Sequence, residues 1–357
     1  MIALMNNKKL VILIIFVLCA GCFHEKAPTP SPHITRSTVK EKRNAVLSMV
    51  QGDNIQVQDE SAPKRNIPTK GITFVDELHG YGFTSGNGET TLMQTGDGGI
   101  TWKVQKGLAP LTAPSSLSFL DYRTGWVLTK ETNGQKSELR LTADGGQTWE
   151  VIAQDLPGLE GKNEVAFFRF FNRQTGLIAV RSDKDLILIR TQDGGITWLA
   201  SNRIPMPGAG VITFLSSKEG WFMGAGASSS SGSNEKGKET VVLYHMTDGG
   251  TWEEAGKIAT SLMPQALTFA DASHGFALLQ SNRQNPEQEQ GRQLLRTSDG
   301  GKTWSQHTFP TAFQPLDASL QLSFLTSSSG WLWDARNVWK TKDGGLNWKL
   351  LLPQAVK

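Results

Sequence analysis

The sequence predicts an all-β protein built from six four-stranded sheets arranged in a ring, and three observations lead to this fold class. An eight-residue pattern, T-x-D-G-G-x-[TN]-W, occurs five times in full and once in a shortened form. A second pattern, a Phe followed six residues later by a Gly, precedes every copy of the first. Gly and Trp are abundant, at 37 and 11 residues, and no long amphipathic helical pattern interrupts the repeats.

The first pattern, which we call the aspartate turn, predicts a tight turn. Asp and Thr side-chain oxygens can accept hydrogen bonds from nearby backbone amides, and Gly-Gly supplies positive φ at little steric cost. The final Trp buries a large apolar surface against the turn. The shortened copy runs from Thr247 to Trp252. The turns contain Asp97, Asp144, Asp193, Asp248, Asp299 and Asp343, and they end at Trp102, Trp149, Trp198, Trp252, Trp304 and Trp348.

The spacing of the repeats predicts a β-propeller. Successive final Trp residues are 44 to 54 residues apart, which is typical of a repeat whose unit is one small sheet. The first unit predicts strands over 72–75, 81–84 and 91–94 and a fourth strand from Trp102, with the aspartate turn between the third and fourth. Such sheets arranged radially protect their edges. Six units predict six blades, and a seventh built from short runs within 38–66 is the alternative.

The N-terminus predicts export. Lys8 and Lys9 precede an apolar run over 10–20, which has the length of a signal-peptide core. The run ends in Leu-Cys-Ala-Gly-Cys22, which resembles the bacterial lipoprotein box and implies a lipid on Cys22. An ordinary secretory signal is the alternative.

These features predict three parts of the chain. Residues 1–21 would be the signal peptide and 67–357 the propeller. Residues 22–66 would be a lipid-anchored flexible tether that could contain short strands. We therefore expect an extracytoplasmic protein anchored to the outer face of the cell membrane.

The aspartate turn and the upstream Phe/Gly pattern together resemble the Asp-box (BNR) repeat, in the form found in propellers of the photosystem II assembly and stability factor type. The resemblance covers about residues 68–352. It implies a non-enzymatic scaffold or assembly factor that binds a protein or peptide, with the Asp boxes in the turns between third and fourth strands. Propellers serve many unrelated functions, so the motif is more specific for fold than for function.

Asp boxes also occur in sialidases and other glycosidases, so a glycan-binding protein or a divergent sialidase-like glycosidase is the alternative. Those sialidases carry Arg-Ile-Pro before the first Asp box, whereas Arg203-Ile204-Pro205 follows the third box of this chain. The chain has only three Tyr to serve as a nucleophile. We expect no catalytic residues and no enzyme.

The remaining composition favours no cofactor or nucleic-acid chemistry. The net charge of +3 arises from interspersed signs and creates no field that would select nucleic acid. The six His residues show no metal-ligand spacing, so we expect neither a metal nor a cofactor. A protein or peptide partner, or a glycan, is the partner class that remains, together with the membrane through the lipid anchor.

A few residues break the repeat and are candidate ligand-binding residues. The position before each repeat Phe holds a small hydroxyl residue except at Arg169. Such an Arg would form a structural ion pair or provide the floor of a site for an acidic group, with Arg181 and Arg203 at its rim. Nine of the eleven Trp occupy repeat positions, which favours packing between blades, whereas Trp333 and Trp339 do not and could form a stacking platform. Because irregular insertions gather between second and third strands, we predict the binding face opposite the aspartate turns.

Overall fold

The computed structural model describes residues 67–86, 89–109, 111, 115–130, 136–161, 163–225, 240–281, 291–308, 320–334 and 336–352. Contacts divide the chain into Met1–Pro63 and Lys64–Lys357, and the account below concerns the second unit. The predicted signal peptide, the tether and Cys22 lie outside the described residues. None of the described segments forms a helix with the length and hydrophobicity that a membrane crossing requires.

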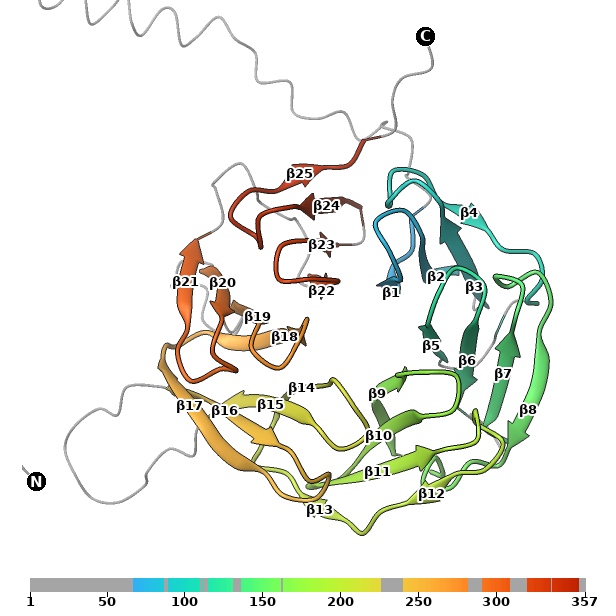
Figure 1. Ribbon diagram of the computed structural model, residues 1–357, viewed down its shortest axis with the longest axis horizontal. Coiled ribbons are helices and arrows are strands. Elements are labelled where there is room, and N and C mark those ends of the chain that lie inside the picture. The colour runs from blue at the N-terminus through green and yellow to red at the C-terminus, as the bar shows by residue number, and fades with distance from the viewer. Residues whose placement is uncertain are drawn as a thin grey trace, which may run out of the picture. The chain divides into compact units, whose positions relative to one another are not determined.

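Six antiparallel four-stranded blades form a ring, which confirms the predicted six-bladed propeller (Figure 1). Within each blade the strands lie side by side in chain order, from the centre of the ring outward. The first three blades contain β1 (Lys70–Phe74), β2 (Gly80–Gly86), β3 (Glu89–Thr95) and β4 (Lys103–Val104); β5 (Ser115–Phe119), β6 (Gly125–Thr129), β7 (Glu138–Thr142) and β8 (Glu150–Gln154); and β9 (Glu164–Phe170), β10 (Gly176–Ser182), β11 (Asp185–Thr191) and β12 (Leu199–Ala200).

The other three blades follow the same plan. They contain β14 (Gly210–Phe214), β15 (Gly220–Ala225), β16 (Thr240–Met246) and β17 (Glu253–Ala259); β18 (Met263–Phe269), β19 (Gly275–Gln280), β20 (Arg292–Thr297) and β21 (Ser305–Thr308); and β22 (Gln321–Phe324), β23 (Gly330–Trp333), β24 (Val338–Thr341) and β25 (Lys349–Leu350). Blade 3 gains a fifth strand, β13 (Ile204–Pro205), which pairs with β11.

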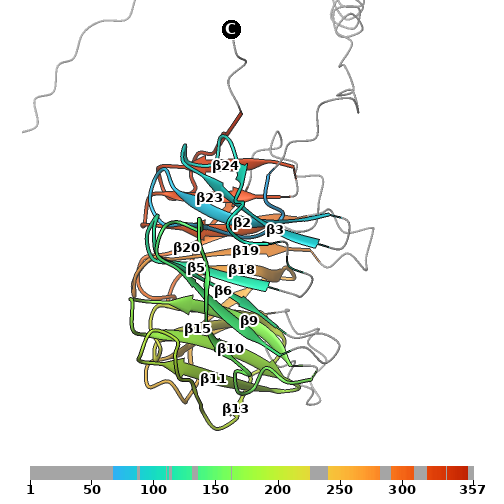
Figure 2. The same cartoon turned by 90° about the vertical axis from the view of Figure 1, so that its right-hand side faces the viewer.

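Each blade consists of one continuous chain segment, so the ring closes without any strand shared between its two ends. Innermost strands β1 and β22 lie side by side where the first and last blades meet. Figure 2 shows the ring edge-on, with the strands running between its two faces. The 1–2 turns and the aspartate turns lie at one end of the blades, and the 2–3 connections lie at the other end.

Neighbouring blades are joined by a repeated aromatic stack. At five of the six junctions the residue after the repeat Gly lies flat on the repeat Phe of the next blade, as Trp126 does on Phe170 with ring centroids 3.8 Å apart. The indole N–H of Trp126 also donates to the carbonyl of Gly194 at 3.2 Å. The same stack occurs for Tyr81 on Phe119, Trp221 on Phe269, Phe276 on Phe324 and Trp331 on Phe74. The interpretation of these residues as packing between blades is therefore confirmed.

The Phe/Gly pattern has a steric cause, because the Phe ring lies over the Gly. A Cβ added to Gly220 would stand 2.3 Å from Phe214 Cδ1, and the other five repeat glycines would meet their own Phe at 2.4 to 2.9 Å. A side chain at this position must displace a buried ring. The invariant spacing thus reflects contact across the β-strand pair, such as Phe214 opposite Gly220.

We predict that Gly220→Ala lowers the free energy of unfolding by about 1–3 kcal/mol, because overpacking forces buried groups apart. Urea denaturation measures this change. Gly86→Ala is the matched control, since an added Cβ there meets nothing within 4 Å, and it should change stability by less than about 1 kcal/mol. Equal effects of the two substitutions would contradict the steric explanation.

Five aspartate turns share one hydrogen-bond pattern. In the second turn, Thr142 Oγ1 donates to Asp144 Oδ1 at 2.8 Å, and the backbone N–H of Gly146 donates to Thr142 Oγ1 at 2.8 Å. The backbone N–H and the hydroxyl of Thr148 donate to the two Asp144 oxygens at 2.9 and 2.6 Å. The hydrogen bond from the Thr148 hydroxyl, followed by that from its N–H, lowers the pKa of Asp144 to about 2. The hydrogen bonds of the Asp144 carboxylate are thus all made within its own turn.

Candidate functional site at the junction of blades 3 and 4

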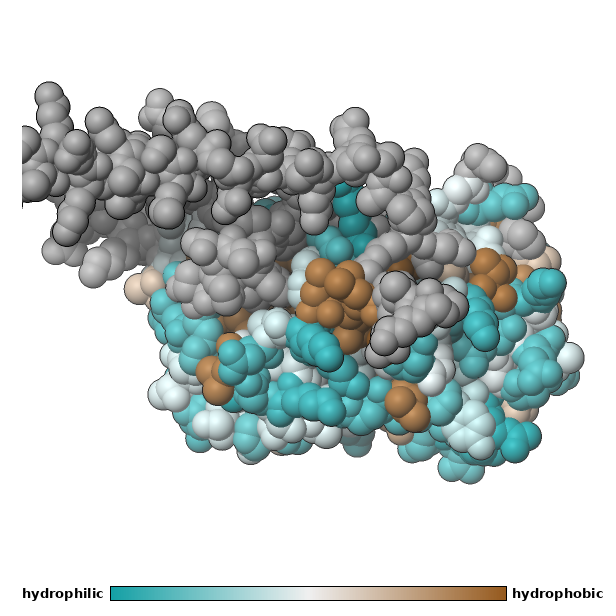
Figure 3. All heavy atoms as spheres, turned by 90° about the horizontal axis from the view of Figure 1, so that it is seen from above, coloured by the Kyte–Doolittle hydropathy of each residue, from teal (hydrophilic) through white to brown (hydrophobic). Residues whose placement is uncertain are grey.

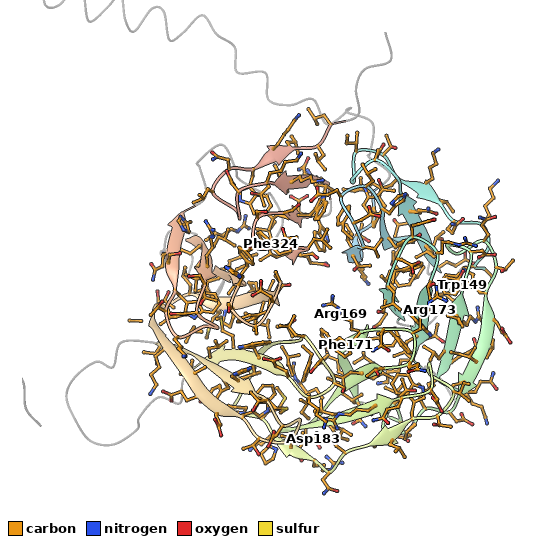
Figure 4. All side chains as sticks on the ribbon, in the orientation of Figure 1. Trp149, Arg169, Phe171, Arg173, Asp183 and Phe324 are labelled. Atoms are coloured by element: carbon orange, nitrogen blue, oxygen red, sulfur yellow. The ribbon has the colours of Figure 1, made fainter. Side chains whose placement is uncertain are left out.

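Arg169 extends from the innermost strand of blade 3 into the opening at the centre of the ring (Figure 4). The side chain is exposed to solvent, yet the surrounding protein desolvates the guanidinium and lowers its pKa. An arginine in this setting keeps its charge. No ion pair or side-chain hydrogen bond joins Arg169 to another residue of the described ranges. The structural ion pair expected as one explanation of Arg169 is thus not formed within the described part.

The equivalent positions of the other blades hold small hydroxyl residues. In blade 2, Ser118 Oγ accepts a hydrogen bond from the backbone N–H of Phe170 at 2.9 Å, which joins the inner strands of blades 2 and 3. Ser118 is the only one of these hydroxyl residues that makes such a bond within the described part of the chain. What distinguishes the junction between blades 3 and 4 at this position is therefore the free cation of Arg169.

A second departure at this junction is the missing aromatic stack. The residue after the repeat Gly is Leu177, and Arg190 lies opposite it on β11. Arg190 Nη2 donates to the carbonyl of Gly249 at 2.8 Å, and its Nε donates to the carbonyl of Ser217 at 2.7 Å. Arg190 thereby takes over the hydrogen bond that an indole N–H makes at other junctions. Desolvation lowers the pKa of its guanidinium.

The shortened aspartate turn of blade 4 is a third departure, and the structure corrects its predicted start. Met246 pairs with Gly220, at the position where the other blades pair the turn Thr with the repeat Gly. Met246 therefore replaces the Thr, and Thr247 is the variable second residue. The backbone N–H groups of Gly250 and Thr251 donate to Asp248 Oδ1 at 2.8 and 2.9 Å, and no Thr side chain two residues earlier takes part.

The shortened turn, which has one residue fewer than the full turns, is also packed more loosely. The second Gly is buried in the five full turns, whereas Gly250 is exposed and an added Cβ there would meet only the Asp248 carboxylate. In the full turns the Trp indole donates to the carbonyl of that second Gly, as Trp198 does to Gly195 at 2.9 Å. Trp252 Nε1 is buried and has no acceptor among the described residues. An unpaired buried donor is costly, so local stability has been given up here.

These departures meet at one junction, which identifies it as the candidate functional site. Function is expected at positions where a repeat departs from its own pattern and gains no stability by doing so. Arg169 directly precedes Phe170, the last residue of β9, and a five-residue turn leads from there to Gly176. The site therefore lies toward the end of the ring that carries the 1–2 turns and aspartate turns. The predicted choice of the opposite face does not hold for Arg169.

The structure does not bring Arg169 together with Arg181 and Arg203. Arg181 pairs in register with Glu164 at the other end of β9, about 16 Å along the strand at roughly 3.3 Å per residue. Its guanidinium lies 3.9 Å from the Glu164 carboxylate and donates to the carbonyl of Gly210 at 3.0 Å. Arg203 lies 3.5 Å from Asp185 and donates to Ser182 Oγ at 3.1 Å. These two arginines form contacts at the opposite face.

The two remaining Trp candidates lie inside the protein. Trp333 is 3% exposed in the core between blades 6 and 1, and Trp339 is 7% exposed in the core between blades 5 and 6. A ring that binds a sugar by stacking must present a face to solvent. The structure therefore places neither residue on a stacking platform.

The sequence did not single out Arg190, Leu177 or Met246 as part of the site. A signal for Leu177 was present in the sequence, because the slot after the repeat Gly is aromatic in the other blades. Arg190 and Met246 emerge only from the strand pairing. The described residues contain no group of three His, Cys, Asp or Glu side chains that could hold a metal ion.

Fold and site together describe a β-propeller with a free cation in its central opening. No protein-family model matches the chain, and no curated protein matches its sequence. Among solved structures, YCF48 from Cyanidioschyzon merolae is similar at 18% identity over 79% of this chain and 95% of that chain, with a TM-score of 0.43. At such identity the likeness concerns the fold alone.

Glycosidases are also among the similar structures. A GH74 enzyme from Niastella koreensis matches at 16% identity over 76% of this chain, with a TM-score of 0.45, and this chain spans 44% of that enzyme. An alpha-L-arabinofuranosidase from Fusarium graminearum matches at 13% identity over 67% of this chain and 81% of that enzyme, with a TM-score of 0.44. These likenesses again concern the fold.

Proposed function

We propose that the protein is a non-enzymatic, extracytoplasmic, lipid-anchored propeller that binds a protein or peptide partner as a scaffold or assembly factor. The observation that carries the proposal is Arg169, a charged guanidinium in the central opening with no partner among the described residues. An unpaired arginine fits a carboxylate of a partner, which it can bind through two parallel hydrogen bonds. The loosened packing around the shortened turn gives the neighbouring surface freedom to adapt.

The described innermost strands place no pair of carboxylates beside Arg169. Glycosidases place two carboxyl groups on either side of the bond that they cleave. The six described innermost strands carry a single carboxylate, Glu164, and it lies beside Arg181 at the end of β9 away from Arg169. The sequence motif that resembles the Asp-box repeat of assembly factors agrees with this proposal.

Site-specific photo-crosslinking in the producing cells tests the proposal. A photoreactive side chain at exposed Gln174, in the 1–2 turn of blade 3, should yield an adduct with one protein partner. Arg169→Ala should weaken partner binding roughly thirtyfold, about 2 kcal/mol, because a buried charge pair loses one member. Arg169→Lys should restore part of the binding, since the charge returns without the fork geometry.

The control is the same photoreactive group at exposed Lys184, at the opposite end of blade 3. Adducts from Lys184 alone would place the binding face at the opposite end, as the sequence first suggested. Adducts from Gln174 that do not depend on Arg169 would remove Arg169 from the site. Hydrolysis of a sialoside, an arabinan or a xyloglucan by the purified protein would favour the glycosidase alternative.

A further inference from the structure

A patch of exposed apolar and basic side chains covers the outer rim where blades 6 and 1 meet. Figure 3 looks onto this rim and shows hydrophobic side chains at several places among hydrophilic ones, with the largest group near the centre of the view. The exposed fractions of Val104, Leu346, Leu350 and Leu352 are 45%, 52%, 36% and 57%. Three exposed lysines lie among them. We call this set the rim patch, and its members are Lys103, Val104, Lys106, Leu346, Lys349, Leu350 and Leu352.

The lysines of the rim patch are not neutralised by the protein. No ion pair joins Lys103, Lys106 or Lys349 to a carboxylate of the described residues. The nearest carboxylates in sequence, Asp97 and Asp343, are held by hydrogen bonds within their own aspartate turns. The rim patch therefore carries three lysines that have no ion-pair partner among the described residues.

The rim of blades 4 and 5 differs in both respects. The outer strand of blade 4 carries Glu253 and Glu254, and Glu254 pairs with Lys257 at 3.0 Å. The outer strand of blade 5 reads Ser-Gln-His-Thr over 305–308. The apolar and basic combination therefore distinguishes this rim from that of blades 4 and 5. Blade 3 also exposes two apolar side chains, Ile196 and Leu199, at 66% and 78%, so the unpaired lysines are the more specific part of the rim patch.

We propose that the rim patch docks on a membrane surface that contains anionic lipid headgroups. Lysines gain free energy near anionic headgroups, and interspersed Val and Leu side chains can enter the boundary between headgroups and acyl chains. The inference rests on the proposed lipid anchor, because about 45 residues between Cys22 and Ile67 can reach up to roughly 150 Å. The chain enters the ring at blade 1, which carries three of the seven members of the rim patch.

Docking by the rim orients the ring on its edge. The strands run between the two faces of the ring, so a ring that rests on its rim leaves both faces clear of the membrane (Figure 2). Arg169 opens toward one of these faces. The orientation thus keeps the proposed partner site accessible while the lipid on Cys22 holds the protein at the membrane.

Hydrogen exchange on the full chain bound to vesicles tests the docking. We expect amides of 103–106 and 346–352 to be protected on vesicles of phosphatidylcholine mixed with phosphatidylglycerol, relative to vesicles of phosphatidylcholine alone. High salt should remove the protection because it screens the lysines. Each Lys→Glu substitution at Lys103, Lys106 or Lys349 should reduce the docking equilibrium at least about fivefold, from the contribution of one lysine near an anionic surface.

Lys302→Glu, on the aspartate turn of blade 5, is the matched control and should leave docking unchanged. Equal exchange of the rim patch on both kinds of vesicle would overturn the proposal, as would protection that appears only when envelope proteins are added. The mass of the Cys22 peptide reports the lipid separately, and the Gln174 adduct reports partner binding separately. Failure of rim docking is therefore distinguishable from failure of the proposed function.

Discussion

Trp331→Ala should lower the free energy of unfolding by about 3–5 kcal/mol, the usual cost of truncating a buried Trp. Trp331 is fully buried and stacks on Phe74, with ring centroids 3.9 Å apart and ring planes 8° apart. Its Nε1 donates to the carbonyl of Gly98 at 2.9 Å. Lys340 Nζ lies 4.5 Å from its ring centroid and 2.6 Å from a Glu77 carboxylate oxygen. These contacts join the last blade to the first.

The substitution should also open the ring at one place. Consecutive blades are connected by the chain itself, whereas blades 6 and 1 share neither a strand nor a peptide connection. Hydrogen exchange should therefore accelerate in β1 and β22 of Trp331→Ala. Trp331→Phe keeps the stack, loses the bond to Gly98 and should cost only about 1–2 kcal/mol.

Trp221→Ala is the matched control, because Trp221 makes the same stack on Phe269 and an N–H bond to Gly300 at a junction that the chain bridges. It should lose similar stability without fast exchange in β1. If both variants accelerate exchange in the same strands, or if β1 is unaffected in Trp331→Ala, side-chain closure of the ring is wrong.

The sequence predicted the blades well because each repeated residue has a task within a few residues or across one strand pair. The spacing from Phe214 to Gly220 follows from a ring lying on a glycine, and the aspartate turn follows from local hydrogen bonds. Predicted strands such as 81–84 are shorter than observed, as with β2 at Gly80–Gly86, because pairing continues past the pattern.

The candidate site was predicted less well than the fold, and individual residues show the physical reasons. Arg169 was found because it is the one residue in its repeat position that is not a small hydroxyl. The insertions that led us to predict a binding face lie at the other end of the ring from it, at 131–137, 181–185, 224–240 and 280–293. Parts of three of them, 131–135, 226–239 and 282–290, lie outside the described residues. Arg190 went unnoticed because it replaces an indole from the neighbouring strand, a substitution visible only with the strand pairing of Leu177. Met246 was missed because the turn of blade 4 is one residue shorter than the others. The sequence therefore appeared to place the first residue of that turn at Thr247 instead of Met246.

Acid should unfold the propeller in a pH window set by the aspartate turns. The pKa of Asp144 is about 2, chiefly through the hydrogen bonds that Thr148 donates, and the pKa of Asp193 is also about 2 through those of Thr197. An Asp in an unfolded chain has a pKa near 3.9. Because the folded pKa is the lower one, the stabilisation is complete above about pH 4 and is lost as the pH falls toward 2. Urea midpoints should decrease across this window.

Thr148→Val tests the cause, because it removes the hydroxyl that donates to Asp144 Oδ2 at 2.6 Å. The pKa of Asp144, followed by NMR, should rise from about 2 toward its ordinary value, and the urea midpoint should be lower than that of the wild type at pH 7. Thr148→Ser retains the hydroxyl and should keep the low pKa. A wild-type Asp144 that titrates near pH 4, or a Val variant with an unchanged titration, would show that the turns stabilise the ring by geometry and not by charge.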